Sequence, residues 1–210
     1  MSLYLKNKLK DNLTTIHIQD PKIDSQSFDY VIAPEHDFIQ GPNVIKSVLA
    51  INHINEKLLL LESDKFTEKL SSLDKPIVTL SIGGKSNNYI FDNAALVSLS
   101  RMIDDTVNNN LISLVILFSR RTESFIKEHL INRYSKMHTV WTDESTNPYL
   151  TLLSQSSCLI CTSDSVSMIS EAVCSKKPVF IFRLKSKKKS NRIEIFNEKL
   201  LQLGYTKELS

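Results

Sequence analysis

The sequence predicts an α/β fold built on a doubly wound parallel sheet in residues 75–210. Two observations lead to this prediction. From residue 75 onward, short apolar runs alternate with longer segments of helical period, which is the rhythm of strands and helices in a parallel sheet. Residues 158–182 then fit a strand, a helix and a strand into one tight βαβ unit, which requires parallel pairing and a right-handed crossover. Such a sheet is of the Rossmann type.

The individual elements follow from these patterns in chain order. Apolar runs predict strands at residues 77–82, 112–118, 139–141, 158–162 and 179–182. Helical periodicity predicts helices at residues 92–110, 122–136, 148–154, 165–174 and 192–203. The runs at 77–82, 112–118 and 158–162 are nearly continuous in apolar residues, which is typical of central strands buried on both faces. We therefore expect these three to form the middle of the sheet.

Residues 1–74 resemble only part of a domain. Short β-branched runs at residues 15–18 and 30–33 predict strands followed by turns, whereas residues 46–56 fit either a strand or a helix. Residues 1–12 show no clear period, and we expect them to be frayed. Two or three strands with so little helix cannot cover a parallel sheet on both faces. We therefore expect residues 1–74 to be a partial N-terminal domain and linker that exposes apolar strand surface.

The bulk composition restricts the classes of partner. A net charge of +3 is too small to indicate nucleic acid, and the apolar share of 41% and charged share of 23% are ordinary for a globular protein. No apolar run has the length of a membrane span, and the N-terminus has no signal-peptide core. Cys158, Cys161 and Cys174 have no second ligand pair nearby, so they indicate buried thiols in a reducing compartment and no metal site. These observations favour the cytoplasm.

The helix predicted at residues 165–174 has an apolar stripe and a polar stripe. Val166, Ile169 and Val173 recur at the spacing of one helix face and are expected to pack on the sheet. Asp164, Ser167 and Glu171 share the polar stripe, in which we expect Asp164 to cap the helix.

The start of this helix is a candidate anion site. The amides at a helix start attract anions, here beside Ser165 and Ser167. Glu171 lies about 10 Å along the axis from Asp164, where it could accept from the hydroxyls of a ribose attached to a bound diphosphate. In the alternative interpretation, Glu171 pairs with Lys176 or Lys177 on a surface helix.

The loops after the predicted strands all fall at one edge of the sheet, where ligands bind in such folds. Glycines allow a backbone to approach a ligand closely, and arginines bind phosphate through two bonds. The residues concerned are Gly83, Gly84 and Lys85, then Arg120 and Arg121, then residues 143–147 with Asn147, and finally Ser163, Asp164 and Ser165. Together they predict an anionic ligand. No dinucleotide-binding G-x-G-x-x-G fingerprint or P-loop is present.

Two further signals each allow two interpretations. His36 stands between Glu35 and Asp37, where it is either a catalytic base oriented by a carboxylate or part of a hydrated turn. The basic run at residues 183–192 either contacts phosphate or an anionic membrane or forms a solvated loop.

The blocks IQDP, PEHD, GPN, SIGG, SRRT, NPYL and TSDSVSMISEA…KKPV occur in that order between residues 16 and 205. Together they resemble the mitochondrial-fission "elongated mitochondria" (ELM) family, which is similar to GT-B glycosyltransferases. The resemblance implies two Rossmann-like domains with a nucleotide-sugar in the cleft, held mainly by the C-terminal domain. It also implies that the Gly83-Gly84 loop and the Ser165 helix start face the diphosphate. Glu171 would bind the ribose, and residues 147–149 would lie near the base.

The chain departs from the family pattern at its N-terminus, and its function has several alternative interpretations. Family members carry most of an N-terminal domain before the IQDP block, so we expect a truncated chain or a separate polypeptide that supplies the missing half. The predicted function is that of a nucleotide-sugar-binding, metal-independent glycosyltransferase without a cofactor. The alternatives are a non-catalytic interaction module at a membrane surface and a nucleotide-sugar epimerase or hydrolase. We expect a cytoplasmic protein, with the periphery of a membrane as a second candidate location.

Overall fold

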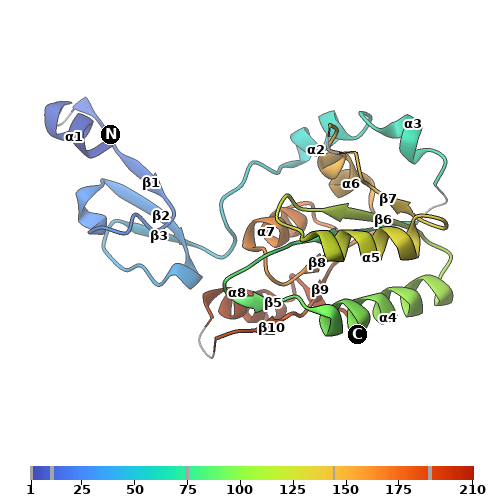
Figure 1. Cartoon of the computed structure of the whole chain (residues 1–210). Helices are drawn as coiled ribbons and strands as arrows, with labels where there is room; N and C mark the ends of the chain where they lie inside the picture. The colour runs from blue at the N-terminus through green and yellow to red at the C-terminus, as the bar shows by residue number, and fades with distance from the viewer. Residues whose placement is uncertain (1, 10–11, 74–75, 144, 189–190) are drawn as a thin grey trace. The chain divides into compact units, whose positions relative to one another are not determined.

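The structure is a computed structural model that describes residues 2–9, 12–73, 76–143, 145–188 and 191–210 (Figure 1). The chain forms two compact units, Met1–Asn52 and His53–Ser210. The region predicted as a partial domain and linker, residues 1–74, therefore spans the whole first unit together with the first two helices of the second. Each unit has its own parallel sheet.

The second unit confirms the predicted α/β fold. Its six-stranded sheet has the order β11-β9-β8-β4-β6-β7, with every pair parallel. The strands are β4 (Ile77–Ile82), β6 (Ser113–Phe118), β7 (Thr139–Val140), β8 (Cys158–Thr162), β9 (Val179–Phe182) and β11 (Lys207–Glu208). The predicted central strands β8, β4 and β6 lie side by side in the middle. Every residue of β4 is buried, which explains its continuously apolar run.

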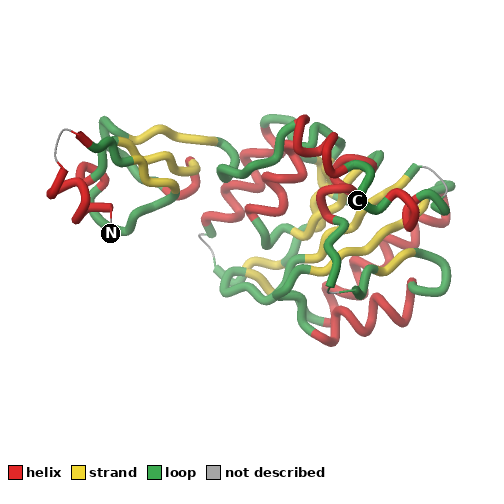
Figure 2. Tube along the Cα trace, turned by 90° about the horizontal axis from the view of Figure 1, so that it is seen from above, coloured by secondary structure: helices red, strands yellow, loops and turns green. Residues whose placement is uncertain are grey.

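Helices cover both faces of this sheet (Figure 2). On one face α4 (Asn93–Asn109), α5 (Ser124–Tyr134) and α8 (Arg192–Gln202) pack on a core that includes Leu80 and Ile116. On the other, α3 (Thr67–Leu70), α6 (Tyr149–Gln155) and α7 (Val166–Cys174) cover residues that include Ile77 and Val115. A further helix, α2 (Glu56–Glu62), accepts a hydrogen bond from Thr151 of α6 at its Glu62 carbonyl.

Side-chain caps fix where several helices begin. The Asp92 carboxylate accepts from the Ala95 amide at 2.9 Å before α4, and Asn191 accepts from the Ile193 amide before α8. Short pairings complete the second unit: β5 (Tyr89–Ile90) and β10 (Lys185–Ser186) form an antiparallel ladder.

The first unit is a small parallel sheet of order β1-β2-β3 with one covered face. Its strands are β1 (Ile16–Ile18), β2 (Tyr30–Pro34) and β3 (Val44–Ser47), with short 3₁₀ turns η2 (Ser25–Ser27) and η3 (Glu35–Asp37). Phe28, Val31 and Ala33 form the core on one face, with Leu3 of α1 (Ser2–Leu9) packed against it. On the opposite face, Ile16, Ile18 and Ile45 are 60%, 51% and 52% exposed.

Two predictions for the first part of the chain are wrong. Residues 2–9, expected to be frayed, form the helix α1, because Leu3 packs on the first-unit core and Lys6 pairs with Asp29 at 2.9 Å. Residues 46–56 form neither one strand nor one helix, since β3 ends at Ser47 and α2 begins at Glu56. Asn55 sets that second boundary by accepting from the Leu58 amide at 3.0 Å.

Candidate functional site

A pocket of about 900 Å³ lies in the second unit at the carboxyl ends of β4 and β6, which is where ligands bind in parallel α/β sheets. Its floor comes from the sheet: Ser81 of β4 and Leu117 of β6. Ser81 and Thr79 are small polar residues in an otherwise apolar strand. Thr79 is hydrogen-bonded to Ser156 at 2.7 Å, whereas the Ser81 position lines the pocket.

One wall of the pocket is the loop after β7, which is held by its own hydrogen bonds. The Trp141 indole donates to the carbonyls of Asp143 and Thr146, both at 3.2 Å. The Asp143 carboxylate accepts from the Ser145 and Thr146 hydroxyls and from the Ser145 amide. These bonds, led by that of the Ser145 hydroxyl, lower the pKa of Asp143 to about 2. Asp143 therefore remains ionised and serves mainly to fix the loop.

The opposite wall is the start of α7. The first amide bonded within this helix is that of Ile169, which donates to the Ser165 carbonyl at 3.1 Å. The amides of Val166, Ser167 and Met168 thus have no acceptor inside the helix, and Ser165, Ser167 and Met168 line the pocket. Ile169 and Ala172 face the sheet and are buried, as the apolar stripe predicted, whereas Val166 and Val173 are only partly buried. This wall offers hydroxyls and backbone donors.

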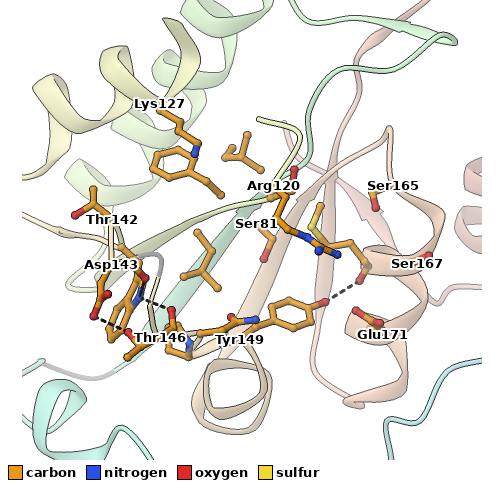
Figure 3. A pocket seen from close by; sticks show the side chains of 18 of the residues that line it. Ser81, Arg120, Lys127, Thr142, Asp143, Thr146, Tyr149, Ser165, Ser167 and Glu171 are labelled. Carbon is orange, nitrogen blue, oxygen red and sulfur yellow. Dashed lines mark hydrogen bonds between the residues drawn. The ribbon is translucent and has the colours of Figure 1, made fainter. Parts of the chain in front are cut away.

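Tyr149 and Glu171 meet at the lower end of the pocket (Figure 3). The Tyr149 hydroxyl donates to the Met168 carbonyl at 3.3 Å, which joins α6 to α7. Burial is the main cause that raises the pKa of Tyr149, and the nearby Cys161 thiol and Glu171 carboxylate add to the effect. Tyr149 is therefore a neutral donor, and Glu171 presents the pocket with a carboxylate. The alternative pairing of Glu171 with Lys176 or Lys177 is not found among the ion pairs of the described residues, and Lys176 pairs with Glu56 instead.

Positive charge comes from the β6–α5 side of the pocket. Arg120 follows β6, and its side chain extends into the pocket toward α7 (Figure 3). Lys127, in the first turns of α5, lines the same side beside Phe118 and Ile131. Guanidinium and ammonium groups facing a helix start form a site suited to phosphate.

The Gly83-Gly84 loop lies outside the pocket lining and has a structural role in this conformation. The Gly83 amide donates to the Thr162 hydroxyl at 2.8 Å, and the Gly84 amide donates to the Asp164 carboxylate at 2.9 Å. A Cβ atom on Gly83 would lie 2.2 Å from the Asp164 carboxylate, and one on Gly84 would lie 2.1 Å from the Arg121 backbone. Both glycines are thus required by close packing between loops.

Asp164 was predicted to cap α7, and this prediction is wrong. Its buried carboxylate accepts from the Thr162 hydroxyl at 2.6 Å and from Gly84, which directs it toward the β4 loop. Ser165 occupies the N-cap position without a side-chain bond to the helix. The reason is that the β4 and β8 loops are adjacent in space, so the carboxylate satisfies the neighbouring loop's donor.

The predicted site residues thus fall into three groups. Those that line the pocket are Arg120, Asn147, Ser165, Ser167 and Glu171. Gly83, Gly84, Lys85, Arg121 and Asp164 lie in adjoining loops outside the lining. His36 is in η3 of the first unit and is buried, contrary to the hydrated-turn interpretation.

The whole sequence, residues 1–210, matches the family model described as "Mitochondrial fission ELM1". The chain belongs to this family. The resemblance drawn from the ordered sequence blocks is therefore confirmed.

Two relatives show how this chain compares with other ELM1-family proteins. It is 27% identical over 217 residues to the uncharacterized protein RP120 of Rickettsia prowazekii (strain Madrid E). This alignment covers 87% of this chain and 61% of RP120. It is 24% identical over 205 residues to the mitochondrial fission protein ELM1 of Arabidopsis thaliana. This alignment covers 84% of this chain and 47% of the Arabidopsis protein. The ELM1-family chain described here thus spans about half to three fifths of the length of these relatives.

Among solved structures, the ELM1-family chain is similar to the wall teichoic acid polymerase TagF, with a TM-score of 0.41 and 14% identity. The match covers 75% of this chain and 38% of TagF. In the part of the chain that the structure describes, no helix is both long enough and apolar enough to cross a bilayer. Clusters of three or more metal-ligating side chains are also absent from those described residues.

Some pocket residues of this ELM1-family member escaped the sequence reasoning. Lys127 lies in a helix whose start was predicted, but nothing in its spacing showed that it faces the pocket. Trp141 ends a predicted strand at the same sheet edge as the other loops, so its position offered a usable signal. Ser81 was hidden inside an apolar run, where a small polar residue in a central strand is the detectable sign.

Proposed function

We propose that this protein binds a nucleotide-sugar in the second-unit pocket and acts as a metal-independent glycosyltransferase of the GT-B type. The observation that carries the proposal is the convergence of Arg120 and Lys127, the start of α7 and the Glu171 carboxylate on one pocket at the carboxyl edge of the sheet. Cations and free amides suit a diphosphate, and a carboxylate suits vicinal hydroxyls. A nucleoside diphosphate carries both groups in one molecule.

In the proposed binding mode the diphosphate lies between Arg120 and the first turn of α7. Glu171 accepts from the ribose hydroxyls, and the base lies toward Asn147 and Tyr149. Breaking the bond between sugar and diphosphate leaves additional negative charge on the phosphate oxygens. Arg120 and Lys127 would stabilise that charge as it develops, which is how fixed cations accelerate such a step.

The assignment of His36 as a catalytic base is a separate part of the proposal, because this residue belongs to the first unit. Replacing His36 with alanine is expected to abolish turnover of the nucleotide-sugar while leaving its binding to the second-unit pocket unchanged. Donor turnover and donor affinity, measured on the same sample, separate these two roles.

Isothermal titration calorimetry with UDP, GDP, CMP and dTDP and their sugar conjugates tests the binding step. Glu171→Ala should weaken the affinity for the preferred nucleotide by about tenfold to a hundredfold, because hydrogen bonds to a charged acceptor are worth about 1.5–3 kcal/mol. Glu128→Ala, on the exposed side of α5, is the matched control and should have no effect.

The same titration tests the phosphate contacts. Arg120→Ala should weaken the binding of a nucleoside diphosphate far more than that of the corresponding nucleoside, whereas Arg101→Ala, on the exposed side of α4, should change neither affinity. Equal affinities of wild type and Glu171→Ala would refute the ribose assignment. The absence of binding by every nucleotide tested would refute the proposed function.

A further inference from the structure

Basic residues from distant parts of the sequence gather beside the pocket in the second unit. Lys85 and Arg121 are joined because the Lys85 amide donates to the Arg121 carbonyl at 2.9 Å and the Arg121 guanidinium reaches the Lys85 carbonyl at 3.5 Å. The Lys187 ammonium donates to the Ser86 carbonyl at 2.9 Å, and its amide donates to the Asn88 carbonyl at 2.8 Å. The group formed by Lys85, Arg121, Lys185, Lys187 and Lys188 is called the cationic ledge below.

The cationic ledge presents unneutralised charge. All of its side chains are exposed, and none forms an ion pair with a described carboxylate. Arg183, at the start of the same basic run, behaves differently: its guanidinium binds Glu194 at 2.7 Å and Glu208 at 2.9 Å, and it also contacts Glu198. The basic run at residues 183–192 therefore contains Arg183, whose charge is neutralised by carboxylates, and lysines at 185, 187 and 188 whose charges are not.

The shape of the ledge indicates an extended partner. None of its residues lines the pocket, whereas small ligands are held in concave sites. Single-stranded nucleic acid is bound by cations interleaved with exposed aromatic rings, but Tyr89 and Phe91, the aromatic residues of the adjoining β5 segment, are buried. Exposed lysines on a two-stranded projection suit a surface that carries many phosphates.

We propose that the cationic ledge docks the protein on an anionic membrane surface by binding lipid phosphates. Each lysine or arginine near such a surface strengthens binding by about fivefold. Because Arg121 directly follows the pocket residue Arg120, docking would bring the pocket opening close to the lipid headgroups. The proposal does not depend on what the pocket binds.

Vesicle co-sedimentation with the full chain tests the ledge. Wild type is expected to bind vesicles of phosphatidylcholine and phosphatidylglycerol, but not phosphatidylcholine alone, and added salt should weaken the binding. Lys185→Glu/Lys188→Glu should lower the affinity by at least about twenty-five-fold, since two cations are lost and replaced by anions. Neither side chain makes a hydrogen bond that the fold requires, and circular dichroism checks that folding is retained.

The control Lys136→Glu/Lys207→Glu reverses two exposed lysines elsewhere, one in the turn after α5 and one in β11. It should bind anionic vesicles as wild type does. Equal losses in both variants would show that only net charge matters and would overturn the proposal. The milder Lys185→Gln/Lys188→Gln, which removes the two positive charges without adding negative ones, should still lose affinity.

Two further outcomes would also overturn the membrane assignment. Binding to a single-stranded oligonucleotide without binding to vesicles would identify nucleic acid as the partner. Displacement from vesicles by low concentrations of inorganic phosphate or glycerol phosphate would indicate a site for a small anion. Nucleotide titration of the same variants keeps this test separate from the pocket, because Lys185 and Lys188 do not line it.

Discussion

The two parallel sheets of this chain use the same strand pairing but are covered differently. In the second unit every residue of β4 is buried, because helices pack on both faces. In the first unit Ile16, Ile18 and Ile45 share a face on which all three are more than half exposed. Parallel ladders are normally found where both faces are buried. We therefore expect apolar side chains to contribute more to the stability of the second sheet than to that of the first.

The largest expected difference between the units is in the cost of removing one isoleucine side chain. Ile169→Ala in α7 should lower the free energy of unfolding by about 2–5 kcal/mol, because this side chain is fully buried and leaves a cavity. Denaturant unfolding followed by the fluorescence of Trp141, which lies in the second unit, measures this cost. Ile45→Ala in β3 should change stability by less than about 0.5 kcal/mol. A large loss from Ile45→Ala would show that its face is covered in solution.

A second contrast concerns glycines that touch neighbouring groups. Gly84→Ala should cost about 3 kcal/mol, since the added Cβ would lie 2.1 Å from the rigid Arg121 backbone. Gly41→Ala in the first unit should cost about 1 kcal/mol, because its nearest neighbours are side-chain atoms of Ser25, Asn43 and Val44 at 2.9–3.2 Å, which can move. Thermal unfolding of the two variants gives the comparison. Equal shifts would mean that the Gly84 loop can relax.

The smallest effect is electrostatic and belongs to the first unit. The Asp29 carboxylate accepts from the Thr15 amide and hydroxyl, both at 2.7 Å, and pairs with Lys6 at 2.9 Å. The Thr15 amide bond, then Lys6 and the Thr15 hydroxyl, lower the pKa of Asp29 well below its usual value. A lowered pKa stabilises the fold above the unfolded-state pKa of about 3.9, and this contribution is lost as the pH falls through the folded-state pKa.

Hydrogen exchange of the first-unit amides measures that dependence. In wild type, the protection of these amides relative to the intrinsic exchange rate should fall on acidification. Asp29→Asn should be less protected at neutral pH and should not show this loss on acidification. Asp143→Asn is the control, because Asp143 also has a lowered pKa but acts within the second-unit pocket loop. First-unit exchange that follows the same course in Asp29→Asn and wild type would refute the assigned role of Asp29.

Local pattern was sufficient for the long elements of the second unit. The strands at 77–82, 158–162 and 179–182 are found with the predicted boundaries, because continuous apolar runs encode burial directly. The two-residue strands β5, β7, β10 and β11 have too few residues for any period to appear. Of these, only β7 was anticipated, from the apolar residues at 139–141. In the first unit, α1 owes its position to contacts with residues that come later in the chain, which no window of sequence contains.

For the candidate site, the sequence predicted which loops lie together but not the contacts between them. Loops that follow strands could be assigned to one sheet edge, and Arg120, Asn147 and Ser165 of these loops line the same pocket. The hydrogen bonds between these loops could not be predicted, because they depend on distances between loops that the sequence does not give. The sequence placed Gly84 and Asp164 in separate loops of the predicted nucleotide-sugar site, whereas in the structure the Gly84 amide donates to the Asp164 carboxylate at 2.9 Å. The periodicity of a sequence does not predict hydrogen bonds between residues of different loops.

The uncovered face of the first sheet also matters while the protein is being made. A growing chain folds from its N-terminus, so β1, β2 and β3 leave the ribosome before any strand of the second unit. Their parallel ladder would form with isoleucine side chains in contact with water, and such surfaces bind chaperones and other nascent chains. The yield of folded protein should therefore depend on chaperone supply and on slow synthesis, even though the second unit has a complete core.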